Sequence, residues 1–165
     1  MRFTKMQGLG NDFIFIEDFE EKILENEIEI AKKVCDRRFG IGADGLVIIR
    51  KSENADAKMI IINSDGSRAN MCGNATRCFA KYIYENGYIK KDIIKIETGD
   101  GIKEAKLVID SKDNVKVITI NMGEPSFDGK DIPLKNKNSL INEDIEINYR
   151  KFYLTSLLIM WKMGC

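Results

Sequence analysis

A cysteine stands directly before a Gly-Asn pair at the point where the sequence predicts the start of a helix. Cys72 is followed by Gly73 and Asn74, and apolar side chains recur at helical spacing from there to Glu85. The first N–H groups of a helix lack backbone partners, and the aligned peptide dipoles favour negative charge beside them. A thiolate at Cys72 and a small carboxylate next to it are therefore both favoured, and Gly73 leaves room for a ligand to approach the backbone. The pattern indicates proton transfer by Cys72 beside a carboxylate, whose developing charge the same N–H groups would stabilise.

The same spacing also fits a purely structural interpretation. Cys72 would then be buried in a strand-to-helix turn, and Asn74 would serve only as a helix cap. Two other cysteines favour such a role for themselves. Cys35 lies on the apolar face of a predicted helix, and Cys78 is six positions, or about 240° of helical rotation, beyond Cys72. Spacing alone leaves both interpretations of Cys72 open.

The chain contains no histidine, which excludes several kinds of site. A Ser-His-Asp triad, a Cys-His pair and a histidine-liganded zinc cannot be built from these residues. The four cysteines include no CxxC pair, so no metal site is predicted. Proton transfer must then fall to Cys, Asp, Glu, Lys or Tyr.

Two further glycine-rich segments could contribute to a binding site. Residues 8–12 read GLGND, and the amide of Asn11 can both donate to a carboxylate and accept from an ammonium. Residues 36–46 read DRRFGIGADGL and bring three glycines and Asp44 between a helix and a strand. Neither segment leads from a strand into a helix of a βαβ unit, so a dinucleotide or phosphate loop is not predicted. Taken singly, each segment also fits a simple turn.

Two helices should position these loops. The first is predicted over residues 27–38, with Asn26 as cap, Glu29 at the capping-box position and Gly40 available to end it. The second is predicted over 74–85, with Ala75, Cys78, Phe79, Tyr82 and Ile83 on its apolar face and Asn86-Gly87 to stop it.

Most of the remaining chain reads as short strands joined by turns. Turn signals at 8–11, 64–67, 98–101 and 111–114 separate segments that are apolar or alternate in polarity, at 1–6, 13–19, 46–50, 57–63, 93–98, 104–110 and 115–122. A polar stretch near 127–144 is expected to be rich in loops. The fold class predicted is α+β, with a mostly antiparallel, barrel-like sheet around the second helix.

Composition excludes some partners. Lys plus Arg equals Asp plus Glu at 26 each, so no net field attracts nucleic acid or an anionic membrane. No apolar run is long enough for a membrane span, and a soluble cytoplasmic protein is expected. A chain of 165 residues suffices for one domain and the beginning of another.

Four segments in register resemble the signature blocks of diaminopimelate epimerases. They are FTKMQGLGNDF at 3–13, DRRFGIGADGL at 36–46, NSDGSRANMCGNATRCFAKY at 63–82 and INMGEP at 120–125. The resemblance runs from residue 1 to about residue 157. Proline racemases and phenazine-biosynthesis-type isomerases share the fold, but proline racemases typically carry histidine where this chain has Asn74.

The resemblance implies a two-domain enzyme that interconverts LL- and meso-diaminopimelate, in lysine and peptidoglycan precursor biosynthesis, without pyridoxal phosphate, metal or other cofactor. Each half would be a strand-rich barrel on a central helix, with the active site between halves. One cysteine removes the α-proton while a cysteine from the other half protonates the opposite face. Matched onto this chain, Cys72 would be one of these groups, Gly73 and Asn74 would hold the α-carboxylate, and Asn11 and Asn63 would recognise the distal end of the substrate. Ala75 stands where many members of the family have glycine.

The end of the chain departs from the family pattern. After residues 152–158 the family continues into a second half with a second catalytic cysteine, whereas this chain reads IMWKMGC. The expected organisation is an N-terminal epimerase domain at 1–150 and the start of a second domain at 151–165. A frameshifted, truncated or deliberately shortened reading frame would explain it. Cys165 lacks the motif of the second cysteine and is expected to be an unpaired exposed thiol, so the chain alone should show little or no epimerase activity.

Other interpretations stay open at this stage. A related isomerase of the same fold is one, and a transferase or hydrolase with Cys72 as nucleophile is another, although no histidine could activate the thiol. A third is a non-catalytic fragment. A half that lacks its partner should also expose apolar surface and form a homodimer or self-associate.

Overall fold

The computed structural model describes residues 2–23, 25–128, 141–155 and 158–159. These residues belong to two compact units, Met1–Asn121 and Met122–Cys165. All the residues predicted to form the site fall in the first unit. The domain boundary expected after residue 150 stays a prediction.

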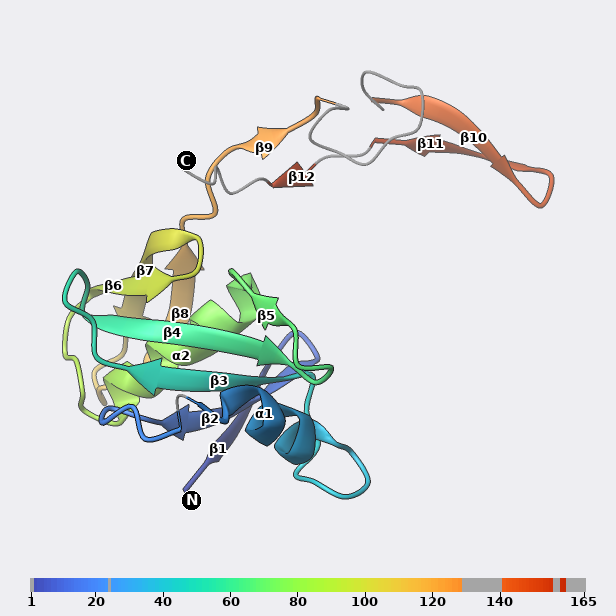
Figure 1. Ribbon diagram of the computed structural model, residues 1–165. Helices are drawn as coiled ribbons and strands as arrows, with labels where there is room; N and C mark the ends of the chain where they lie inside the picture. The colour runs from blue at the N-terminus through green and yellow to red at the C-terminus, as the bar shows by residue number, and fades with distance from the viewer. Residues whose placement is uncertain (1, 24, 129–140, 156–157, 160–165) are drawn as a thin grey trace. The chain divides into compact units, whose positions relative to one another are not determined.

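The first unit contains one mixed sheet (Figure 1). Its strands are β1 (Thr4–Gly8), β2 (Asn11–Glu17), β3 (Gly45–Arg50), β4 (Ala57–Asn63), β5 (Arg68–Ala69), β6 (Ile93–Thr98), β7 (Gly101–Ile109) and β8 (Val115–Ile120). They lie in the order β1-β2-β3-β4-β6-β7-β8, and β5 pairs with β4 beside this path. Within the described residues of this sheet, β2–β3 and β4–β6 are parallel and the other pairs are antiparallel. The predicted mostly antiparallel α+β architecture is confirmed.

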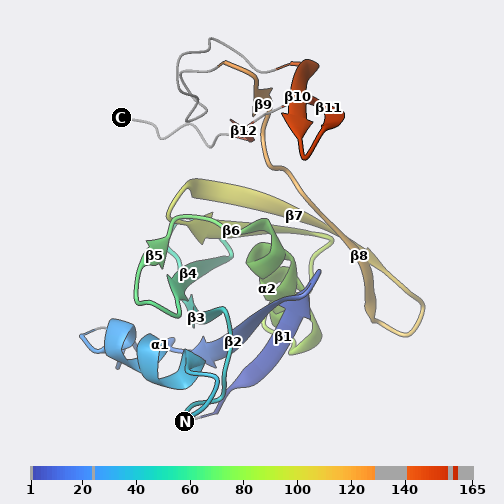
Figure 2. The same cartoon turned by 90° about the vertical axis from the view of Figure 1, so that its right-hand side faces the viewer.

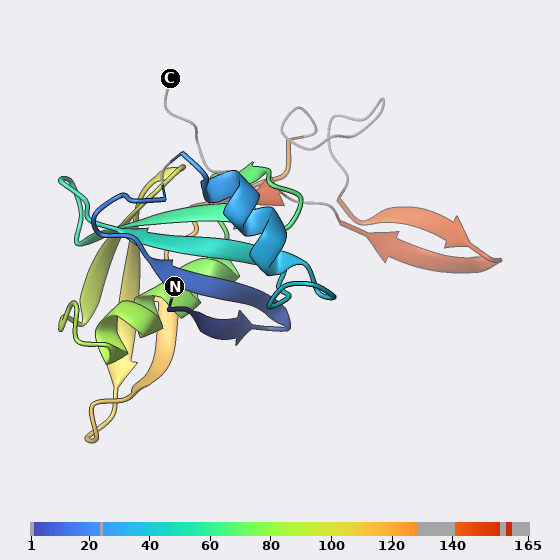
Figure 3. The same ribbon diagram turned by 60° about the horizontal axis from the view of Figure 1, so that its bottom comes forward.

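The two helices lie on opposite faces of this sheet. The sheet curls around α2 (Gly73–Glu85), which contacts strands from β1 to β8 (Figure 2). On the other face, α1 (Glu27–Cys35) lies across β3 and β4 (Figure 3). Two separate apolar clusters result, one around each helix.

Strands β2 and β3 are buried on both faces, which explains their continuous apolar sequences. In β2, Phe13 and Phe15 belong to the cluster around α2, whereas Ile14 and Ile16 belong to the cluster around α1. A strand covered on both faces has no need for polar residues at alternate positions. Because side chains alternate across a strand, a shift of one residue would exchange the two sets. This burial therefore fixes the register of β2 and the position of the residues at its start.

Helix α2 matches the sequence prediction closely. The predicted stripe Ala75, Cys78, Phe79, Tyr82 and Ile83 is buried, as are Thr76, Ala80 and Tyr84. The helix ends as expected at Asn86-Gly87. The N–H of Gly87, which has a φ of 78°, donates to the Tyr84 carbonyl, and the N–H of Tyr88 donates to the Ile83 carbonyl. These two bonds form a Schellman motif, which satisfies the last carbonyls of the helix.

Helix α1 begins at Glu27 as predicted but differs from its prediction in its last residue and in its capping. It stops at Cys35, not at residue 38, because the Asp36 carboxylate accepts the N–H groups of Arg38 and Phe39 and turns the chain. Asn26 occupies the predicted N-cap position, but the prediction that its side chain caps the helix is wrong, since that side chain makes no capping hydrogen bond. The first turn is held instead by the buried carboxylate of Glu27, which accepts a hydrogen bond of 3.1 Å from Arg50.

The second unit contains short antiparallel pairs. Strands β10 (Glu143–Ile147) and β11 (Arg150–Leu154) form a hairpin, and β12 (Leu158–Ile159) pairs with β9 (Pro125–Ser126). Most of the polar stretch predicted to be loop-rich lies outside the described residues.

Phe79 is fully buried where the sheet curls around α2, so we expect its removal to destabilise the first unit. Phe79→Ala should lower the free energy of unfolding by about 3–5 kcal/mol, the usual cost of a cavity of this size. Urea denaturation followed by circular dichroism measures this change. As a control, Val117→Thr on β8, where the side chain is more than half exposed, should change stability by less than about 0.5 kcal/mol. Equal losses in the two variants would contradict the assigned core.

Candidate functional site

Cys72 is the N-cap residue of α2. Its backbone is extended, with φ −147° and ψ 115°, and its carbonyl accepts the N–H of Thr76 at 2.9 Å and the Thr76 hydroxyl at 2.8 Å. The side chain is partly exposed and packs at the margin of the core around α2. The sulfur is thus held at the first turn of the helix and remains accessible.

Unpaired backbone donors adjoin this sulfur. Within the described residues, the N–H groups of Gly73, Asn74 and Ala75 have no hydrogen-bond acceptor. The first turn also contains no acidic side chain that would neutralise the positive end of the helix. Three donors together with the helix dipole make this end suited to a carboxylate ligand.

The structural interpretation of Cys72 is wrong on two points. Cys72 is not fully buried, and the Asn74 side chain does not cap the helix. Instead, the Oδ1 atom of Asn74 accepts a hydrogen bond from the Arg77 guanidinium one turn further along α2. Gly73, which has no side chain, can contribute only its backbone N–H to the site.

Asn11 lies directly across from Cys72. The two-residue turn of Leu9 and Gly10, both with positive φ, joins β1 to β2 and pairs Gly8 with Asn11. Asn11 therefore opens β2, and its Oδ1 accepts a hydrogen bond of 3.7 Å from the Cys72 thiol. The segment GLGND, which fits a turn when taken alone, also brings a predicted binding residue to the cysteine.

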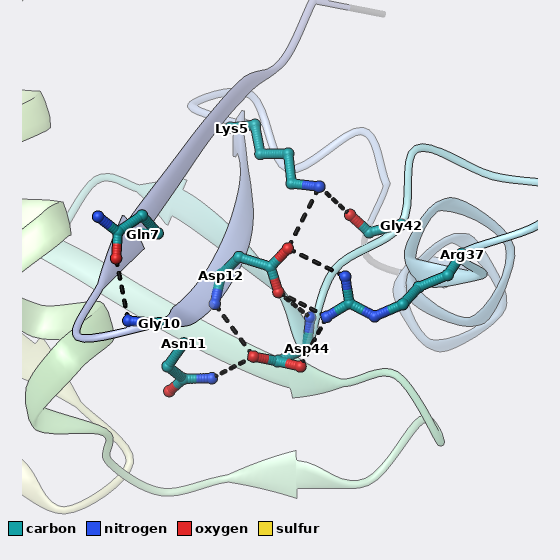
Figure 4. Close-up of polar contacts among 8 residues, drawn as sticks. All are labelled: Lys5, Gln7, Gly10, Asn11, Asp12, Arg37, Gly42 and Asp44. Atoms are coloured by element: carbon teal, nitrogen blue, oxygen red, sulfur yellow. Dashed lines mark hydrogen bonds and ion pairs between the residues drawn. The ribbon is translucent and has the colours of Figure 1, made fainter.

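A network of charged side chains supports Asn11 from behind (Figure 4). Asn11 Nδ2 donates to Asp44 Oδ2 at 2.7 Å, and Arg37 donates to Asp44 Oδ1 at 2.8 Å. Arg37 also forms two hydrogen bonds, of 2.7 and 3.2 Å, with the Asp12 carboxylate. Lys5 forms an ion pair with Asp12 at 3.2 Å and donates to the Gly42 carbonyl. The loop after α1 is thereby tied to the β1–β2 hairpin.

These contacts keep both carboxylates ionised. The Arg37 guanidinium holds the pKa of Asp12 well below its usual range, with a further contribution from Lys5. The Asn11 amide and the N–H of Asp12 lower the pKa of Asp44. The pKa of Arg37 is raised in turn, chiefly by Asp12.

Asn63 lies at the same end of the sheet as Asn11. It ends β4 and pairs with Gly45, which in turn pairs with Phe13 of β2. Its Nδ2 donates to Ser67 Oγ at 2.9 Å, inside the turn that follows β4. Within the described residues no hydrogen bond joins Asn63 to Cys72. The structure thus brings Asn11 into contact with Cys72 and places Asn63 further along the same sheet end.

The other described cysteines are structural, as predicted. Cys35 and Cys78 are buried, one in each apolar cluster. Burial raises the pKa of Cys35 to about 11 and also raises the pKa of Cys78. Cys165 lies outside the described residues.

The described part of the chain contains no group of three or more Cys, Asp and Glu side chains arranged to hold a metal ion. None of its helices is long and apolar enough to cross a membrane.

Sequence reasoning missed the roles of Lys5, Asp12, Arg37 and Asp44. For Asp12, Arg37 and Asp44 the available signal was the presence of charged residues inside two glycine-rich loops, where flexible turns do not require them, whereas Lys5 lies in β1 and carried no such signal. The contact of the Asp12 N–H with the Asp44 carboxylate, 32 residues apart, depends on the parallel pairing of β2 with β3, which local sequence does not reveal.

Comparison with known proteins settles the family. The sequence model of the diaminopimelate epimerase family matches residues 3–127. A diaminopimelate epimerase from Clostridium perfringens is 53% identical over 159 residues, which cover 96% of this chain and 58% of that protein. The chain belongs to the diaminopimelate epimerase family. It spans a little over half the length of the curated family members that it matches.

Solved structures of other proteins share the fold of this member of the diaminopimelate epimerase family. A phenazine biosynthesis protein of the PhzF family from Bacillus anthracis matches 75% of this chain and 40% of its own, with a TM-score of 0.59 at 20% identity. A hydroxyproline epimerase from Agrobacterium vitis matches 94% of this chain and 48% of its own, with a TM-score of 0.59 at 12% identity. At such identities the likeness concerns the fold alone. The sequence matches therefore distinguish the diaminopimelate epimerase family from its relatives with the same fold.

The accessibility of the cysteines predicts the order in which they react. At neutral pH iodoacetamide should label Cys72 well before Cys35 and Cys78, because burial limits access and raises the pKa of the latter two thiols. Mass spectrometry of proteolytic peptides at successive times measures the three rates. In urea the three rates should converge. Native labelling of Cys78 as fast as Cys72 would contradict the assigned environments.

The ion-pair network predicts a specific pH dependence of stability. Carboxylates with a lowered pKa stabilise the fold above their unfolded pKa of about 4, and this stability is lost as the pH falls through the lower folded pKa. Arg37→Met should therefore destabilise the protein at pH 7, and the difference from the wild type should shrink between pH 5 and pH 2. Thermal unfolding followed by circular dichroism measures this. Arg38→Met is the matched control, because in the described residues the Arg38 side chain has no partner. A constant difference between Arg37→Met and the wild type across this range would show that the ion pairs are not responsible.

Proposed function

We propose that this chain forms the part of a diaminopimelate epimerase that carries one of two acid/base groups, Cys72. The observation that supports this most directly is the partly exposed thiol at the N-terminus of α2, beside the unpaired N–H groups of Gly73, Asn74 and Ala75. An amino-acid α-carboxylate bound to these donors would bring its α-carbon close to the sulfur.

The chemistry needed is a proton transfer on each face of one carbon. A thiolate at Cys72 would take the α-proton and become a thiol, and the electron pair of the broken C–H bond would spread onto the α-carboxylate. The N–H groups at the start of α2 would stabilise that charge, which is the usual role of such donors. A second thiol on the opposite face would then give its proton to the carbon and leave it inverted. In the reverse direction the two groups exchange roles.

The second acid/base group must come from elsewhere in the enzyme. Cys35 and Cys78 are buried in the two cores, and Cys72 serves only one face of the substrate carbon. This chain spans only a little over half the length of the family members that it matches, so their remaining part is the natural source. The reaction proposed is therefore cofactor-independent epimerisation of LL- to meso-diaminopimelate, with this chain supplying half of the site.

Substrate recognition would use the polar groups around the cysteine. The backbone at Gly73 and Asn74 would hold the α-carboxylate, and Asn11 and Asn63 would face the distal amino-acid end. Asn11 contacts the Cys72 thiol, and Asn63 lies at the same end of the sheet.

A chimaera tests this proposal. Residues 1–157 of this chain would replace the aligned segment of the Clostridium perfringens relative, which supplies the rest of the enzyme. We expect release of α-deuterium or tritium from labelled LL-diaminopimelate, with formation of the meso isomer. Cys72→Ser in the chimaera should lower the rate at least about 100-fold, the lower range for loss of general acid/base catalysis. Cys78→Ser, at a buried cysteine, is the matched control and should retain most of the activity.

The isolated chain provides the complementary measurement. In deuterated water with LL-diaminopimelate it should show no inversion, because only one face meets a base. Proton NMR follows the loss of the α-proton signal, and chiral chromatography identifies the product. Rapid deuteration with inversion by the isolated chain would contradict the division of the two bases between two parts of the enzyme.

A further inference from the structure

The side chain of Asn11 has two chemically different ends, and its environment selects between them. Nδ2 lies 2.7 Å from Asp44 Oδ2, and Oδ1 is the atom that meets the Cys72 thiol. An ionised carboxylate can only accept hydrogen bonds, so the amide nitrogen must face Asp44. Figure 4 shows the Asn11 amide nitrogen directed at Asp44. The planar amide then turns its carbonyl oxygen the other way, toward the Cys72 thiol.

Asp44 is itself held in place from several directions. Its Oδ2 also accepts the N–H of Asp12 at 3.0 Å, and its own N–H donates to the carbonyl and to the carboxylate of Asp12, each at 3.0 Å. Arg37 bridges the two carboxylates with hydrogen bonds of 2.7 and 2.8 Å. Because Asp44 Oδ2 receives both the Asn11 amide and the N–H of Asp12, it cannot turn away without breaking two bonds.

We propose that Asp44, braced by Arg37 and Asp12, is a positioning residue that fixes the orientation of the Asn11 amide. The group that Asn11 presents toward Cys72 is then always a hydrogen-bond acceptor. The consequence for substrate recognition rests on the proposed function and adds the orientation of Asn11 to it. The part of the ligand that meets Asn11 must be a hydrogen-bond donor such as an ammonium group. A carboxylate cannot bind there, because the carboxylate and Asn11 Oδ1 are both acceptors.

A simple structural role for Asp44 makes a different prediction. If Asp44 only tied the loop after α1 to the hairpin, its replacement would affect stability but not the chemistry at Cys72. Asp44→Asn has nearly the same shape and removes the restriction to accepting hydrogen bonds. In that variant the Asn11 amide can rotate and direct its NH₂ group at the sulfur, where it would stabilise the thiolate.

The test is a double-mutant cycle read out by labelling of Cys72. The rate of alkylation of Cys72 by iodoacetamide at neutral pH is measured by peptide mass spectrometry in the wild type, Asp44→Asn, Asn11→Ala and the double variant. We expect Asp44→Asn to raise the rate at least about threefold, since hydrogen bonds to a charged sulfur are among the stronger ones. In the Asn11→Ala background the same change should alter the rate by less than about twofold, because its effect passes through the amide.

Two controls separate positioning from other effects. Glu104→Gln removes one negative charge from an exposed side chain of β7 and should leave the Cys72 rate unchanged. Asp44→Glu keeps a carboxylate acceptor and should restore a rate near that of the wild type. An equal increase in both Asn11 backgrounds would mean that Asp44 acts through its charge alone, and no increase in either would mean that it is structural. Either result overturns the proposal.

Folding of the variants and activity of the chimaera are measured separately from the labelling rates. If Asp44→Asn fails to fold by circular dichroism, Arg37→Lys weakens the same brace and should raise the rate by a smaller factor, again only when Asn11 is present. Labelling needs no substrate, so the cycle remains decisive even if the chimaera proves inactive. In an active chimaera, Asp44→Asn should raise KM more than it lowers kcat, because Asn11 would bind the distal end and not the reacting carbon.

Discussion

The position of Cys72 depends on the burial of α2 inside the curled sheet. Eight of the thirteen helical residues are buried, and Phe79 and Ile83 are among the largest fully buried side chains. Each such side chain contributes about 1.5–3 kcal/mol when it is removed from water. The helix cannot slide or rotate without exposing this stripe. Its N-terminus, with the sulfur and the unpaired N–H groups, is therefore fixed by packing along its entire length.

The second constraint is the double burial of β2 and β3, which determines what surrounds the cysteine. Their parallel pairing aligns Phe13 with Gly45, so that the preceding residues Asn11, Asp12 and Asp44 come together at one end of the sheet. The loop after α1 returns to this end because the N–H groups of Ile41 and Gly42 both donate to the Val34 carbonyl. That return delivers Arg37 to the two carboxylates. The apolar layers on both faces thus set the geometry of a polar cluster that lies outside them.

Local pattern was sufficient to predict the elements but not the polar network. Strand β4 agrees with the predicted residues 57–63, and α2 begins one residue earlier than predicted. Both elements carry strong periodicity, and the hairpin turns at 98–101 and 111–114 carry strong turn signals. The end of α1 and the anchoring of its first turn were missed, because Asp36 and Glu27 find partners that no local pattern reveals.

The site residues differ in the same way. Cys72 and Gly73 were identified from their position before a helix, which is a local property. Asn11 is indicated by its amide in a glycine-rich loop and by the resemblance to a family, and Asn63 by the resemblance alone. The sheet supplies the reason that they share one end. The role inferred for Asp44 needed a tertiary contact, because only the position of Asn11 Nδ2 beside Asp44 shows which end of the amide is occupied.

The proposed function places an unequal demand on the two parts of the enzyme. Inversion at carbon requires two groups on opposite faces, aligned within a fraction of an ångström when the proton moves. In this chain the cysteine is held by a packed helix, and Asn11 by a hairpin with a braced amide, so little adjustment is available here. Lys5 and Arg37 match Asp12 and Asp44 one for one, so the brace adds rigidity without a large net charge beside the substrate. Under the proposed mechanism, any movement that admits the substrate and brings the second base to the carbon must therefore belong to the remainder of the enzyme.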